Sequence, residues 1–89
     1  MGLPRLRSIL SRRRKQREAD GILRVGAVFQ LPHFSYTVYQ EAVELLEVEV
    51  PDQVAANLKK LDRTPWDQMT QDAKLFVYQS CMALLPTLV

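Results

Sequence analysis

The middle of the chain carries apolar residues at the spacing of an amphipathic helix. They recur at i, i+3, i+4 and i+7, with glutamate and glutamine between them. The apolar members are Tyr39, Ala42, Val43, Leu46 and Val50. Thr37 with Gln40 fits a capping box, so we predict a helix that begins at Thr37. The residue at which this helix ends is not fixed by the pattern, because residues 48–50 alternate as in a strand. Pro51 ends the segment whether it is a helix or a strand.

A second helix is predicted directly after this break. Pro51 suits the first helical position, and Asp52 is favourable at the positive end of the helix dipole. The inner face is expected to consist of Val54, Ala55, Leu58 and Leu61.

A third helix is predicted at Thr64-Pro65-Trp66-Asp67. The order of a capping side chain, a proline and an acid is typical of a helix start. Apolar residues then keep one face for about five turns until Pro86. These residues are Met69, Ala73, Phe76, Val77, Cys81 and Leu84.

Residues 22–31 form a mostly apolar run with valine, isoleucine and phenylalanine, which favours a buried strand or extended segment. Gly21 suits the end of a preceding helix. Pro4 and the spacing of nearby leucines predict that this preceding segment is helical, with disorder as the alternative. The expected fold is therefore mainly α: a small domain of three to four helices over residues 21–89, with a short β segment near 22–31 and a basic arm over residues 1–20.

With 89 residues, 47% of them hydrophobic, the chain has the composition of one globular domain. A single cysteine excludes an internal disulfide and paired-cysteine metal sites. No apolar run approaches the length of a membrane span, and arginine interrupts the only leader-like stretch.

Positive charge is concentrated at the front of the chain. The first twenty residues hold seven basic and two acidic side chains, giving +5, whereas the remaining residues hold five basic and eight acidic ones, giving −3. Such an arm is expected to bind an anionic surface. Its candidate binding residues are Arg5, Arg7, Arg12, Arg13, Arg14, Lys15 and Arg17.

Several targets suit this arm. They are an anionic membrane surface, the phosphates of a nucleic acid and the nuclear import machinery; a mitochondrial presequence has the same composition. Ser8 and Ser11 have arginines beside them, as substrates of basophilic kinases do, and phosphate on either would cancel part of the charge.

Residues for catalysis are sparse. His33 is the only histidine, and Cys81 is expected to be a small core residue. The glutamates between residues 41 and 49 have no histidine at metal-ligand spacing. We expect no enzymatic activity, no cofactor, no metal and no small-molecule substrate.

The last residues suggest a peptide ligand. Thr87-Leu88-Val89 resembles the C-terminal ligands of class I PDZ domains, which add a strand to a sheet edge. The alternative is that this leucine-rich end packs onto the core.

Together these features predict a small interaction protein. Its arm would dock on a membrane or nucleic acid, and its acidic helical body would bind a protein partner or a second copy. Adaptors and small viral matrix and accessory proteins resemble this design. The expected location is cytoplasmic or nuclear, with peripheral membrane association. The alternatives are a mitochondrial complex subunit, whose arm would be a presequence, and a direct RNA- or DNA-binding protein.

Overall fold

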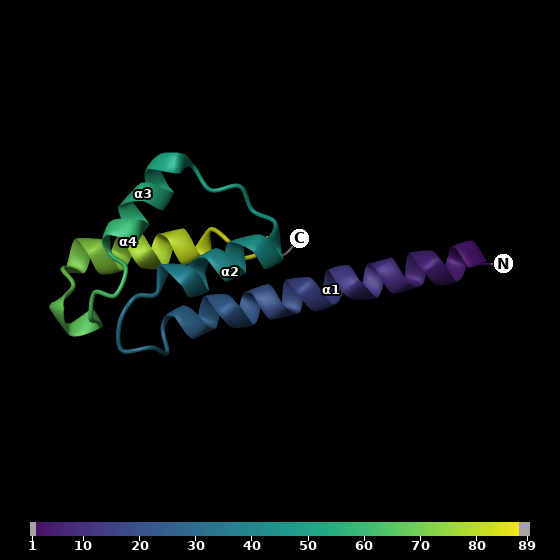
Figure 1. The fold of residues 1–89 in the computed structure, drawn as a ribbon, viewed down its shortest axis with the longest axis horizontal. Helices are drawn as coiled ribbons and strands as arrows, with labels where there is room; N and C mark the ends of the chain where they lie inside the picture. The colour runs from purple at the N-terminus through teal and green to yellow at the C-terminus, as the bar shows by residue number, and fades with distance from the viewer. Residues whose placement is uncertain (1, 88–89) are drawn as a thin grey trace.

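A computed structural model gives the arrangement of the chain (Figure 1). It describes the backbone of residues 2–87 and the side chains of residues 13–87. Within that part the elements are α1 (Gly2–Val28), α2 (Tyr36–Leu46), α3 (Asp52–Lys60), the 3-10 helix η1 (Trp66–Gln68) and α4 (Gln71–Met82). The described residues form four α-helices and no sheet, so the predicted mainly α fold of three to four helices is confirmed in its helical class.

Helix α1 contradicts the predicted β segment near 22–31. It continues through Gly21 to Val28 and ends in a turn in which the amides of Phe29 and Gln30 bond three residues back. The reason is the face that α1 buries: Gly21, Val25 and Val28, at helical spacing, are buried, whereas Leu23 is 71% exposed. The continuous apolar run is therefore a helix with part of its apolar surface left in solvent.

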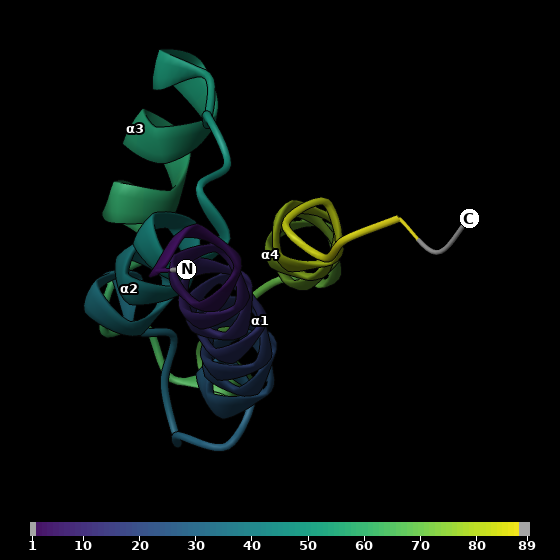
Figure 2. The same ribbon diagram turned by 90° about the vertical axis from the view of Figure 1, so that its right-hand side faces the viewer.

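Gly21 lies inside this helix, so its predicted role as a helix end is wrong. Helices α1 and α2 form an antiparallel pair (Figures 1 and 2). A Cβ atom at Gly21 would overlap the side chain of Leu46 and lie 3.3 Å from Cβ of Leu45. The glycine therefore permits the close approach of the two helices, and the expected boundary between arm and body falls inside one continuous helix.

Helix α2 begins earlier than the predicted capping box. Ser35 is the N-cap, and its hydroxyl accepts a hydrogen bond from the amide of Val38 at 3.3 Å. The carboxylate of Asp62 accepts from the amide of Tyr36 at 2.8 Å, which satisfies another free donor of the first turn. Thr37 therefore lies inside the helix and does not cap it.

The ambiguity at residues 46–50 is resolved in favour of a helix end followed by irregular chain. Helix α2 stops at Leu46, and Glu47 adopts a left-handed conformation with φ of 55°. The amide of Val48 donates to the carbonyl of Val43, five residues earlier. This is the 6→1 hydrogen bond of a Schellman motif. The next helix, α3, follows Pro51 as predicted, with Leu58 buried and Lys59 and Lys60 in its last turn.

The predicted start of the last helix at Thr64 is wrong. Helix α4 begins at Gln71, where the hydroxyl of Thr70 accepts from the amide of Ala73 at 3.1 Å. The backbone of Thr64 is engaged elsewhere, because its carbonyl accepts from the amide of Phe34 at 3.0 Å. The indole N–H of Trp66 likewise donates to the carbonyl of Leu31 at 2.7 Å. These bonds fix residues 64–66 beside the α1–α2 connection.

The core lies where α1, α2 and α4 meet, with Leu58 contributed by α3. Its buried apolar residues are Val25, Val28, Phe34, Tyr39, Ala42, Val43, Leu58, Met69, Val77, Cys81 and Leu84. Among the described residues, no helix has both the length and the apolar character needed to cross a bilayer.

Candidate functional site

The basic side chains of α1 divide into two groups. Arg13, Arg14 and Lys15 are exposed, and none of them forms an ion pair with another described residue. Successive helical residues are 100° apart, so these three cations point to different sides of the helix. Arg5, Arg7 and Arg12, with the candidate phosphorylation sites Ser8 and Ser11, lie outside the described side chains.

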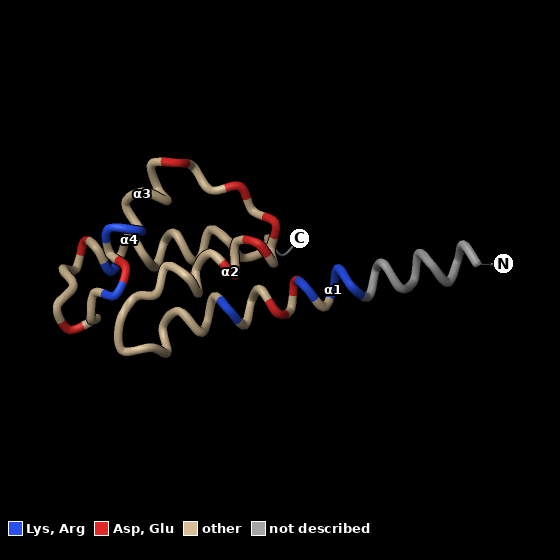
Figure 3. Tube along the Cα trace, viewed as in Figure 1, with Lys and Arg blue, Asp and Glu red and all other residues tan. Residues whose placement is uncertain are grey.

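Arg17 belongs to the second group, which contacts α2. Its guanidinium donates to the carbonyl oxygen of Glu44 at 3.1 Å and lies 3.9 Å from the carboxylate of Glu47. A cation at this position also compensates the negative end of the α2 dipole. Arg24 similarly lies 3.3 Å from the carboxylate of Glu41. Two arginines of α1 thus contact α2 or the residue that follows it, and the acidic positions they meet lie along the neighbouring helix in Figure 3.

Both ion pairs are solvent-exposed. The side chains of Arg17 and Glu47 are 51% and 77% exposed, so their attraction contributes at most about 1 kcal/mol. Arg17 therefore orients α1 against α2 only weakly. The sequence carries no local signal for this contact, because Arg17 is 27 residues from Glu44 and 30 residues from Glu47.

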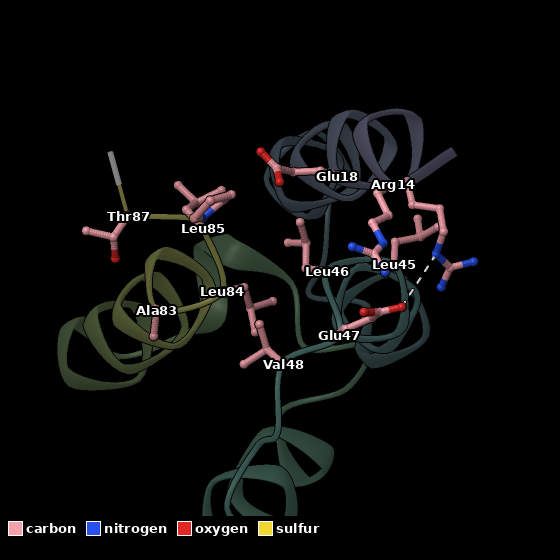
Figure 4. A pocket seen from close by; sticks show the side chains of 12 residues that line it. Arg14, Glu18, Leu45, Leu46, Glu47, Val48, Ala83, Leu84, Leu85 and Thr87 are labelled. Carbon is pink, nitrogen blue, oxygen red and sulfur yellow. Dashed lines mark ion pairs between the residues drawn. The ribbon is translucent and has the colours of Figure 1, made fainter. Parts of the chain in front are cut away.

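A cleft of about 440 Å³ lies beside this basic segment (Figure 4). It is bounded by α1, the end of α2 and the residues that follow α4. Leu46, Val48 and Leu84 form its apolar part, and Leu84 and Val48 point toward each other. Arg14 and Glu47 lie at its rim. The charges at the rim are of both signs, so the cleft is a poor site for a simple anion or cation.

Groups with nucleophilic chemistry are buried. Burial raises the pKa of the Cys81 thiol from 9.0 to about 12. Burial, with smaller contributions from Cys81 and Tyr36, raises the pKa of the Tyr39 hydroxyl from 10.0 to about 12. Both groups are therefore protonated at neutral pH, and a buried thiol is a poor nucleophile. Cys81 is a core residue, as predicted.

The only histidine of the sequence has a backbone partner. His33 is half-buried, and its Nδ1 lies 3.1 Å from the carbonyl oxygen of Phe34. Across residues 13–87, no three His, Cys, Asp or Glu side chains gather closely enough to hold a metal ion.

The C-terminal segment packs on the core only in its first part. Leu84 is buried and Leu85 is partly buried, whereas Pro86 and Thr87 are exposed. Leu88 and Val89 lie outside the described residues, so the PDZ-ligand hypothesis stays a prediction.

An exposed apolar surface on α4 and on the last turns and end of α1 was not predicted from the sequence. Ile22 and Phe29 are 42% and 40% exposed, and Leu75 and Tyr78 are each 53% exposed. The rings of Phe29, directly after α1, and Tyr78 of α4 lie 6.3 Å apart, so the exposed apolar side chains of the two helices meet at these two residues. The seven-residue spacing of Ile22 and Phe29 was the available signal, and it was hidden in the run assigned to a strand. We name these four residues the α1–α4 apolar surface.

Comparisons with known proteins give no relative for this chain: no protein-family model, no curated protein and no solved structure matches it.

Proposed function

We propose that this chain is a non-catalytic binding protein that docks on the phosphates of a nucleic acid through α1. The observation that carries the proposal is the presence of three exposed cations on consecutive residues, Arg13, Arg14 and Lys15, none paired with an acid of the described chain. Cations without internal partners attract polyanions over several ångströms and release the counterions of the bound phosphates.

The direction of these cations favours a nucleic acid over a membrane as the target. A flat bilayer meets one side of a helix, whereas Arg13, Arg14 and Lys15 point to different sides. The grooves and folds of a nucleic acid surround an inserted helix with phosphates, so all three cations find partners. A peripheral membrane helix would instead carry its cations on one face.

The body of the molecule supports a second, protein-binding role. Exposed large apolar side chains that adjoin one another are typical of surfaces that contact other proteins. The α1–α4 apolar surface has this property at Phe29 and Tyr78, and Phe29 also stacks on Trp66 with ring centroids 5.9 Å apart. We therefore propose an adaptor in which α1 binds nucleic acid and the apolar surface binds protein.

The test is a binding titration with a labelled RNA hairpin and a labelled DNA duplex at increasing salt. Replacing Arg13, Arg14 and Lys15 together by glutamine is expected to weaken binding at least tenfold. It should also reduce the slope of log K against log salt by about 2 to 3, because about 0.7 to 0.9 counterion is released for each phosphate neutralised.

The matched control removes the same charge elsewhere. Lys59, Lys60 and Arg63 are exposed at the other end of the molecule (Figure 3), and replacing them by glutamine should leave affinity and salt slope nearly unchanged. Equal losses in both triple variants would show that net charge alone governs binding. Binding to vesicles with anionic lipid but to neither nucleic acid would contradict the proposal in favour of a membrane.

A further inference from the structure

A second concave surface lies on the opposite side of the body from α1. It is a groove of about 330 Å³ between α3 and α4, and the α2–α3 connection closes one end. Its apolar lining includes Tyr39, Val48, Val50, Val54, Phe76 and Leu84. Figure 2 shows α3 diverging from α4, so that no described element covers the groove between them.

The rim of this groove is acidic. Glu49 lines the groove, and Asp52 adjoins it at the start of α3; both are exposed. Among the described residues that line the groove, none is a lysine or arginine. Figure 3 shows the acidic positions following one another along the α2–α3 connection. The surface is therefore apolar at its floor and negative at its edge, which fits a helix that carries leucines beside arginines.

The chain itself contains a segment of this composition. Residues 2–12 hold Leu3, Leu6 and Leu10 at the spacing i, i+3 and i+7, together with three arginines and no acid. The charges are complementary, because this segment is purely basic while the body beyond residue 20 has a net charge of −3. We propose that residues 2–12 of one copy occupy the α3–α4 groove of a second copy.

The connectivity requires that the groove belong to another molecule. Helix α1 is continuous from Gly2 to Val28, and its later turns pack on α2. Residues 2–12 of the same chain would reach the groove only if α1 broke, at the cost of its hydrogen bonds. Reciprocal exchange between two copies closes a two-fold dimer, whereas exchange in one direction only builds an open chain.

The experiment measures self-association of the full chain by sedimentation velocity without nucleic acid, from about 5 to 200 µM, a range suited to micromolar dissociation constants. We expect concentration-dependent association. Reversing the rim with Glu49→Lys and Asp52→Lys should weaken it at least tenfold, and Arg5→Glu with Arg7→Glu should do the same.

A charge-swap variant separates the proposed contact from general effects of charge. A variant with all four substitutions has a basic groove rim and an acidic segment at residues 2–12, so the two surfaces attract each other again. Its dissociation constant should return to within about threefold of that of the unmodified chain. The matched control is Asp67→Lys with Asp72→Lys, which reverses two exposed acids that do not line the groove. Like Asp52, each of them lies in the first turn of a helix. This control should associate as the unmodified chain does.

Three outcomes would overturn the proposal. The first is a monomer throughout the concentration range. The second is a rim reversal that weakens association no more than its control does. The third is association that Tyr78→Lys abolishes while the rim reversal leaves it intact, which would place the contact on the α1–α4 apolar surface. Because the assay contains no nucleic acid, its result is independent of the binding role proposed for Arg13 to Lys15.

Discussion

Replacing Gly21 by alanine tests the closest contact between α1 and α2. The added Cβ would meet the side chain of Leu46, with its Cδ2 only 2.7 Å away. Nonbonded carbon atoms prefer separations of about 3.5 to 4.0 Å, so either the leucine must change its conformation or the helices must move apart. Gly26 provides the matched control, since it lies in the same helix and a Cβ there would meet nothing within 4 Å.

The two substitutions share one energy term and differ in another. Each replaces a glycine inside a helix by alanine, which stabilises the helix by about 0.8 to 1.0 kcal/mol. Gly26→Ala should therefore raise the free energy of unfolding by nearly that amount. Gly21→Ala adds an overpacking cost of about 1 to 3 kcal/mol at the contact with Leu46, so its net effect ranges from neutral to about 2 kcal/mol destabilising. The difference between the variants isolates the contact at about 1 to 3 kcal/mol.

Urea unfolding followed by far-ultraviolet circular dichroism measures both variants. For a domain of 89 residues, 1 kcal/mol corresponds to about 4 to 8 °C in Tm, so thermal scans resolve the difference as well. Truncating Leu46 to alanine in the Gly21→Ala background should relieve part of the clash, which a double-mutant cycle would report as a favourable coupling. If Gly21→Ala stabilises as much as Gly26→Ala does, the argument that Gly21 permits the close approach is wrong.

Three further predictions concern stability. Thr70→Ala should cost about 1 kcal/mol through the lost N-cap of α4, whereas Thr64→Ala should cost less than about 0.5 kcal/mol; equal costs in urea unfolding would contradict the assigned helix start. Trp66→Phe should lower the free energy of unfolding by about 1 kcal/mol, because the indole hydrogen bond is lost. Urea unfolding followed by circular dichroism measures this, and an unchanged urea midpoint would show that the bond contributes nothing to stability. Since the pKa values of Cys81 and Tyr39 are raised to about 12 in the folded state, the unfolded chain releases their protons first as pH rises above about 9, and stability should fall by up to about 1.4 kcal/mol per pH unit for each group. Cys81→Ala should make that fall shallower in urea titrations between about pH 8 and 11, and an unchanged slope would contradict the burial of the thiol.

The helical class and much of the inner surface could be predicted because they depend on local periodicity. The spacing of Val77, Cys81 and Leu84 identified the buried face of α4, and Pro51 marked the start of α3. The start of the last helix was predicted wrongly because two threonines suit the same local role. Thr64 and Thr70 both precede plausible helix starts. The bonds that tie residues 64–66 to the α1–α2 connection, and the N-cap bond of Thr70, decide between them.

The candidate site was predicted in part. Arg13, Arg14 and Lys15 are exposed, which fits their proposed role, and a run of like charge indicates this without a structure. Arg17 was grouped with them from the sequence, yet it contacts the end of α2. The α3–α4 groove lies between segments that are distant in the chain, so no local pattern predicts it. For the α1–α4 apolar surface, the spacing of Ile22 and Phe29 was a local signal, but only the tertiary structure brings Phe29 next to Tyr78.

Three features followed from the sequence by itself: the chain is mainly helical, its basic charge is concentrated near the N-terminus, and its cysteine belongs to the core. Each depends on residue type and on local periodicity, which can be read without knowing the tertiary contacts. Only the tertiary structure determined the secondary structure of residues 22–31. A run of apolar residues satisfies a strand and a helix equally well until a partner is present. Helix α2 provides that partner, and the packing of Gly21, Val25 and Val28 against it selects the helix.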